Sequence, residues 1–137
     1  MNSDSTHTAA SGADAELTAI RAHYQDLIGF MPKRVDDRVQ LGLQTAPEMT
    51  TAIEALRAQL IDPKALDRKT SQLIAFAILL VNGSVAAENH AVAALRAGAS
   101  VEELQAAAGI AFVFRGVPAI NLSGECIEGA LKKIQHG

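Results

Sequence analysis

The stretch Gln72-Leu-Ile-Ala-Phe-Ala-Ile-Leu-Leu-Val-Asn-Gly-Ser84 decides the fold. Between Leu73 and Val81 it is apolar without interruption. This run is far shorter than the ~20 apolar residues of a membrane-spanning helix. Asp67 can cap a helix that starts just before the run, and the Asn-Gly-Ser sequence can end it. The stretch therefore predicts a helix over residues 68–81 that is buried on most sides.

Three further helices are predicted downstream from their end signals. We expect a helix over residues 85–97 with Gly98 as its C-cap, and then a capping box, Ser100-Val-Glu-Glu103, that starts the next helix. The sequence Gly116-Val-Pro118 ends that helix and begins the last one. Helical spacing predicts these inward positions: Leu104, Ala108, Ala111 and Phe112 in the first of the two, and Ile120, Ile127, Leu131 and Ile134 in the second.

Upstream, the sequence contains three amphipathic segments. Asp14 is expected to cap the first, and Pro47 to lie in the first turn of the third. We expect residues 1–13 to be a disordered tail and residues 14–137 to form one all-α domain of six or seven helices, because no strand pattern appears. The predicted stripes are Leu17, Ile20, Tyr24, Leu27 and Ile28, then Val35, Val39 and Leu43, and finally Met49, Ile53, Leu56 and Leu60.

The composition excludes several classes of function. Hydrophobic residues make up 49% and aromatic residues 4%, so alanine and aliphatic residues must build the core, which favours packed helices. The net charge is -3 without a basic patch, which argues against a nucleic-acid or membrane partner. Cys126 is the single cysteine, so a disulfide within the chain and a cysteine-rich metal site are excluded. The first residues lack the features of a secretory signal, and we expect a cytoplasmic protein.

The apolar helix also bears on assembly. A chain of this length has little surface with which to cover such a helix, and large exposed apolar patches are rare on monomers. We therefore predict a homo-oligomer. The alternative is that one subunit wraps the helix by itself.

Three motifs resemble those of a known family. They are Leu66-Asp-Arg-Lys-Thr-Ser-Gln-Leu-Ile-Ala-Phe-Ala77, His90-Ala-Val-Ala-Ala-Leu-Arg-Ala-Gly-Ala-Ser-Val-Glu-Glu-Leu104 and Gly116-Val-Pro-Ala119. Together they resemble the carboxymuconolactone decarboxylase and alkylhydroperoxidase D family over residues 66–131. The resemblance implies an all-α subunit that assembles into a homotrimer or homohexamer.

The peroxidase branch of that family uses a glutamate, a Cys-x-x-Cys pair and a histidine. Here the glutamate position holds Gln72. Counted from Gln72, the two cysteine positions hold Ser84 and Ala87; counted back from His90, they hold Gly83 and Ala86. Neither alignment supplies a thiol, and a hydroxyl cannot replace a thiolate in peroxide reduction.

His90 is the candidate catalytic residue. Small alanines surround it at helical spacing, which leaves space for a ligand or for a closely packed helix. A histidine can transfer protons near neutral pH. The alternative is a histidine bonded to a helix backbone at a subunit contact. Glu88 lies two residues away, does not share a helix face with His90, and is interpreted as a solvated charge.

Four further residues are candidates for substrate binding, and each also has a structural interpretation. Gln72 could donate to a substrate oxygen or be a satisfied amide near a helix end. Asn82 and Ser84 lie at a helix junction that could bind an anion, or they could cap the next helix. Arg115 could pair with a substrate carboxylate or with a helix C-terminus. No histidine pair has metal-ligand spacing, so no metal is expected.

The resemblance and the residues together favour a cofactor-free enzyme of aromatic-compound catabolism. It would resemble a carboxymuconolactone decarboxylase, a carbon–carbon lyase, and act on a small-molecule substrate, a carboxylated lactone or related acid. One alternative is an alkylhydroperoxidase or peroxiredoxin-type redox protein. Another is a non-catalytic oligomer that binds small acids.

Overall fold

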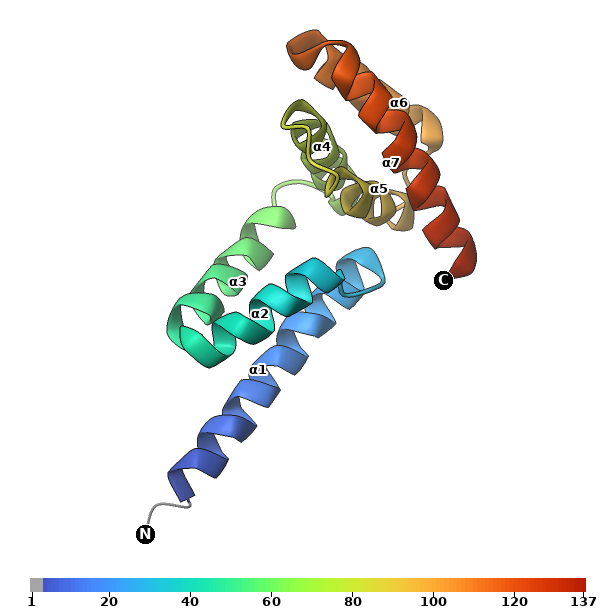
Figure 1. Cartoon of the computed structure of the whole chain (residues 1–137). Helices are drawn as coiled ribbons and strands as arrows, with labels where there is room; N and C mark the ends of the chain where they lie inside the picture. Colours follow the sequence, from blue (N-terminus) through green and yellow to red (C-terminus); the bar gives the residue numbers. More distant parts are fainter. Residues whose placement is uncertain (1–3) are drawn as a thin grey trace. The chain divides into compact units, whose positions relative to one another are not determined.

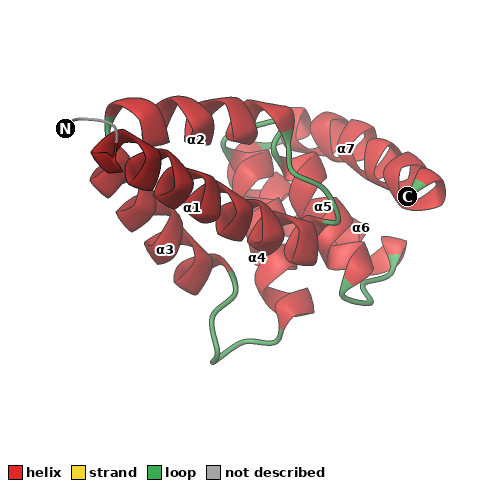
Figure 2. Ribbon diagram, turned by 90° about the horizontal axis from the view of Figure 1, so that it is seen from below, coloured by secondary structure: helices red, strands yellow, loops and turns green. Residues whose placement is uncertain are grey.

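The computed structural model describes residues 4–137, with side chains from residue 12 onward, and over this range it contains seven helices and no strand (Figures 1 and 2). This confirms the predicted all-α fold. None of the described helices combines the length and the hydropathy that a membrane span requires. The helices are α1 (Asp4–Ile28), α2 (Lys33–Thr45), α3 (Pro47–Ile61), α4 (Arg68–Val81), α5 (Ala87–Arg96), α6 (Val101–Arg115) and α7 (Val117–His136).

The chain divides into two compact units. The N-terminal unit contains Met1–Asp26 and Phe30–Leu60, and the C-terminal unit contains Leu27–Gly29 and Ile61–Gly137. The tail that was predicted to be disordered spans residues 1–13, and its first three residues lie outside the described part of the chain. Helix α1 begins at Asp4, so Asp14 lies inside this helix. The Asp14 carbonyl accepts a hydrogen bond from Thr18 Oγ1. Asp14 is therefore not the N-cap that the sequence predicted.

In the N-terminal unit, most of the predicted residues of α1 and α2 are buried, with Leu17 and Val35 half-buried, but those of α3 are not. Ile20, Tyr24, Val39 and Leu43 are buried. On α3, the side chains that face inward are Thr50 and Glu54. The predicted apolar stripe of α3 is wrong, because its members are 46–68% exposed: Met49, Ile53, Leu56 and Leu60.

A buried carboxylate explains why the polar face of α3 turns inward. Tyr24 Oη donates to Glu54 Oε2 at 2.9 Å, and Arg38 forms an ion pair with Glu54. The Arg57 guanidinium lies 4.6 Å from the centre of the Tyr24 ring. Burial raises the pKa of Tyr24 to about 12, and the negative charge of Glu54 adds to that rise.

The close packing of α2 on α3 depends on a glycine. A Cβ placed on Gly42 would overlap the side chain of Thr50, so only a residue without a Cβ fits here. The helices can therefore approach closely at the position where Thr50 is buried.

In the C-terminal unit, α4 packs against α5 and α6, and α7 packs against the same two helices. The helix ends follow the predicted signals. Asp67 caps α4 by accepting from the Thr70 backbone N–H at 2.8 Å, and Ser100 and Glu103 form the expected capping box of α6. Gly116 has φ +87°, a conformation that side chains rarely adopt, and it turns the chain between α6 and α7.

Helix α4 is buried on one side only. Phe76 and Leu80 are fully buried, whereas Ile74 and Ile78 are 45% and 54% exposed. Apolar residues of α6 continue this surface, which encloses a groove of about 510 Å³. We call it the apolar face; its large members are Ile74, Ile78, Ile110 and Phe114. The prediction that α4 is buried on most sides is thus wrong for the chain by itself.

Two predictions for the later helices also need correction. Phe112 was expected to face inward and is 44% exposed, and Ile120 and Ile134 are about as exposed, at 39% and 40%. Glu88 is not a freely solvated charge, because its carboxylate lies 2.5 Å from Lys133 Nζ on α7.

Candidate functional site

Gln72 and His90 meet in the core of the C-terminal unit. Gln72 is near the start of α4 and His90 is near the start of α5, and these two helices pack against each other. His90 Nδ1 lies 2.8 Å from Gln72 Oε1. Gln72 is fully buried and His90 is 7% exposed. The sequence placed both residues among the candidates, and the fold makes them direct partners.

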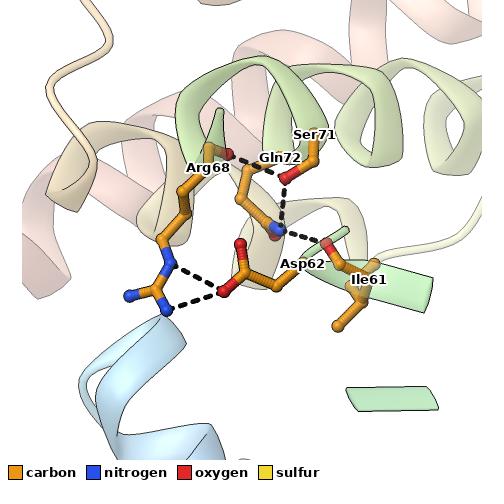
Figure 3. Close-up of polar contacts among 5 residues, drawn as sticks. All are labelled: Ile61, Asp62, Arg68, Ser71 and Gln72. Atoms are coloured by element: carbon orange, nitrogen blue, oxygen red, sulfur yellow. Dashed lines mark hydrogen bonds and ion pairs between the residues drawn. The ribbon is translucent and has the colours of Figure 1, made fainter. Parts of the chain in front are cut away.

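The amide nitrogen of Gln72 is already committed to the protein. Nε2 donates to the Ile61 carbonyl at 2.9 Å and to Ser71 Oγ at 3.4 Å (Figure 3). Ser71 in turn donates its own hydroxyl hydrogen to the Arg68 carbonyl. An amide nitrogen carries two hydrogens, and both have partners here. The geometry therefore favours a role for Gln72 in holding His90, rather than the substrate-donor role expected from sequence.

An ion pair between the two ends of the loop that connects α3 to α4 supports this arrangement. Arg68 Nε and Nη2 donate to Asp62 Oδ2 at 3.1 and 2.7 Å (Figure 3). The pair joins the first turn of α4 to the residue that follows Ile61. No sequence pattern pointed to Ile61, because it contributes a backbone carbonyl, and Ser71 was likewise not predicted.

Asn82 and Ser84 lie at the opposite end of α4. The backbone N–H groups of Asn82, Gly83 and Ser84 all donate to carbonyls of the last turn of α4. Ser84 Oγ accepts from the Ala86 N–H at 3.3 Å. Of the two roles that the sequence left open at this junction, the hydrogen bonds favour capping over anion binding. Helix α5 accordingly begins at Ala87, two residues later than predicted.

Arg115 lies near this junction. A Cβ placed on Gly83 would be 3.9 Å from Arg115 Nη2, and the Arg115 side chain is exposed. Ten residues separate Gln72 from Asn82, which corresponds to ~15 Å along a helix axis. The structure thus pairs Gln72 with His90, and it brings Arg115 close to the Asn82–Ser84 turn.

The cysteine cannot readily supply redox chemistry. Cys126 is buried on α7. Burial, together with the charge of Glu88, raises the pKa of its thiol to about 11. The reactive form in peroxide reduction is the thiolate, which such a pKa disfavours. Among the described residues, no group of histidine, cysteine and carboxylate side chains has the arrangement of a metal site.

Two cavities lie away from His90. One is the groove on the apolar face. The other, of about 150 Å³, belongs to the N-terminal unit and is lined in part by Glu16, His23 and Glu54. His90 lines neither of these cavities, so its contact with a substrate is inferred from its chemistry and not from a cavity.

Comparison with known proteins identifies the family. The chain resembles the crystal structure of a candidate carboxymuconolactone decarboxylase from Burkholderia xenovorans LB400, with a TM-score of 0.74 and 23% identity over 90% of this chain and 95% of the other. At this identity the likeness shows a shared fold. A comparison with curated proteins gives no match. The sequence model of the carboxymuconolactone decarboxylase family matches residues 47–124, which is more than half of the chain and includes both Gln72 and His90. The chain therefore belongs to the carboxymuconolactone decarboxylase family.

Proposed function

We propose that the protein is a cofactor-free decarboxylase of a small carboxylated lactone, with His90 as the proton donor. The observation that carries the proposal is the buried His90–Gln72 pair, at 2.8 Å, in a member of this family. The surroundings support proton transfer better than redox chemistry, because the single thiol is buried and its pKa is raised.

The reaction requires the breaking of one carbon–carbon bond and the transfer of one proton. The bond between a ring carbon and its carboxylate breaks, CO2 leaves, and the electron pair delocalises into the lactone carbonyl. The His90 imidazolium then delivers a proton to carbon, and the neutral imidazole regains a proton from water. An apolar environment destabilises the carboxylate relative to the spread charge of the transition state. The alanines beside His90, at positions 91, 93 and 94, are buried and supply such an environment.

The remaining candidates take different roles in this proposal. Gln72 holds the imidazole and does not touch the substrate. Asn82 and Ser84 shape the turn between α4 and α5. Arg115 has an exposed guanidinium and would attract an anionic substrate by its charge.

We also propose that a second copy of the chain covers the apolar face. The face brings together half-exposed isoleucine and phenylalanine side chains from two neighbouring helices. Exposed apolar surface of this kind typically marks an interaction site. Association through α4 and α6 would complete the burial of the apolar helix, as expected for the trimer or hexamer that the family resemblance implies.

The proposed function is tested by following CO2 release from a carboxylated muconolactone. Wild-type protein should release CO2 without added metal or cofactor, and His90→Asn should lower kcat by about 100-fold or more, the usual contribution of a general acid. His136→Asn, at an exposed histidine in the last turn of α7, is the matched control and should retain full activity.

Two outcomes would contradict the proposal. Tight binding of the lactone without any CO2 release would indicate a binding protein. Peroxide turnover that survives Cys126→Ser would show a redox activity for which the chain has no second cysteine.

A further inference from the structure

The orientation of the Gln72 amide follows from its partners. The Ile61 carbonyl can only accept a hydrogen bond, so the Gln72 atom that lies 2.9 Å from it must be the nitrogen. Ser71 gives its hydrogen to the Arg68 carbonyl, so its oxygen is also an acceptor toward Gln72. Both contacts require the same orientation, with Nε2 toward Ile61 and Ser71. Gln72 Oε1 consequently faces His90.

This orientation determines which ring nitrogen of His90 carries hydrogen. Gln72 Oε1 can only accept, and His90 Nδ1 lies 2.8 Å from it. The tautomer with hydrogen only on Nε2 would place two lone pairs against each other between two buried side chains. Leaving such buried groups unpaired is costly enough to favour the Nδ1–H tautomer by about 10-fold or more.

We infer that Gln72 is a positioning residue that keeps neutral His90 in the Nδ1–H tautomer, so that Nε2 is the atom that gains and loses the transferred proton. Gln72 is itself held by Ile61 and Ser71 (Figure 3). The Asp62–Arg68 ion pair ties Asp62, the residue directly after Ile61 at the end of α3, to the start of α4. The contacts of Nε2 with Ile61 and Ser71 thus fix the position of the acceptor oxygen, Gln72 Oε1.

The neutral amide has a chemical consequence that rests on the proposed function. A glutamate at this position would place a negative charge next to the imidazolium and stabilise it. Glutamine accepts the same hydrogen bond without that charge. The imidazolium of His90 is therefore a stronger acid than it would be beside a carboxylate, and it delivers its proton to carbon more readily.

The tautomer is tested by NMR on the full-length protein with ¹⁵N-labelled histidine, since two-bond couplings from the ring carbon protons separate the Nδ1–H and Nε2–H forms. Wild-type His90 should show the Nδ1–H pattern at a pH where it is neutral. Gln72→Met, which has a similar volume and no strong acceptor, should lose the preference. Gln105→Met, at an exposed glutamine of α6, is the matched control.

The inference is overturned if wild-type His90 shows the Nε2–H pattern, or if folded Gln72→Met keeps the Nδ1–H pattern. The wild-type spectrum decides the question even if a variant does not fold. In the decarboxylation assay, we expect Gln72→Met to lower kcat at least 10-fold with little change in KM. A wild-type protein with the Nδ1–H pattern but no CO2 release would refute the proposed function and leave the tautomer assignment in place.

Discussion

Replacing Tyr24 with phenylalanine tests the buried cluster of the N-terminal unit. The change keeps the ring and removes only the hydroxyl that donates to Glu54 Oε2 at 2.9 Å. Hydrogen bonds to charged groups contribute ~1.5–3 kcal/mol, and Glu54 keeps its ion pair with Arg38. We therefore expect Tyr24→Phe to lower the free energy of unfolding by about 2 kcal/mol near neutral pH.

The same residue makes stability depend on pH. The pKa of Tyr24 is about 12 in the folded protein, against an ordinary value of 10.0. Folding therefore favours the neutral phenol, and this contribution is complete below the unfolded pKa and is lost as pH rises toward the folded one. At pH 11, this effect should have lowered the free energy of unfolding of the wild-type protein by up to about 1.4 kcal/mol. Tyr24→Phe has no phenol and therefore no such loss. The gap between the two proteins should shrink from about 2 to below about 1 kcal/mol.

Two measurements check this reasoning. Urea unfolding of both proteins, followed by circular dichroism between about pH 8 and pH 11, gives the gap directly. Phenolate absorbance gives the pKa itself, because Tyr24 is the only tyrosine and the chain has no tryptophan. A gap that stays constant with pH, or phenolate formation in the folded protein near the ordinary tyrosine pKa, would refute the assigned burial and hydrogen bond.

Three other predictions concern separate features of the molecule. Ile78→Asp, on the apolar face, should shift the sedimentation coefficient toward that of the monomer. Ile53→Asp, at an exposed isoleucine outside the apolar face, should leave it unchanged. An unchanged oligomer in both variants would rule out the apolar face as the interface. Folded protein should react with iodoacetamide at Cys126 far more slowly than urea-unfolded protein at the same pH, because the thiol is buried and its pKa is raised; equal rates would contradict this. Gly42→Ala should lower the free energy of unfolding by about 1 kcal/mol, since overlap with Thr50 costs more than the better helix propensity of alanine recovers. A stabilised variant in thermal unfolding would show that α2 and α3 separate easily.

The helix ends were largely predictable because capping is local. Asp67 bonds to a backbone group three residues away, and the Ser100–Glu103 box closes within one turn. The absence of a redox thiol pair also follows from the sequence, which contains one cysteine. Such features need no knowledge of the rest of the chain.

The inward face of α3 and the grouping of site residues were decided by tertiary structure. Helical spacing predicted an apolar stripe on α3, yet Glu54 turns inward because Tyr24 and Arg38, from two other helices, satisfy its carboxylate. Likewise, Gln72 and Asn82 both flank the apolar run, but a rigid helix holds them ~15 Å apart.

The sequence by itself determined the helices, the family and the candidate histidine, because capping signals, apolar periodicity and motif residues act over a few positions. Only the tertiary structure showed that Gln72 has both amide hydrogens committed and its oxygen against His90. The physical reason is that hydrogen-bond partners of a buried side chain come from segments distant in sequence, here the Ile61 carbonyl and the His90 ring. Their directions are set by how the helices pack, which no local pattern encodes.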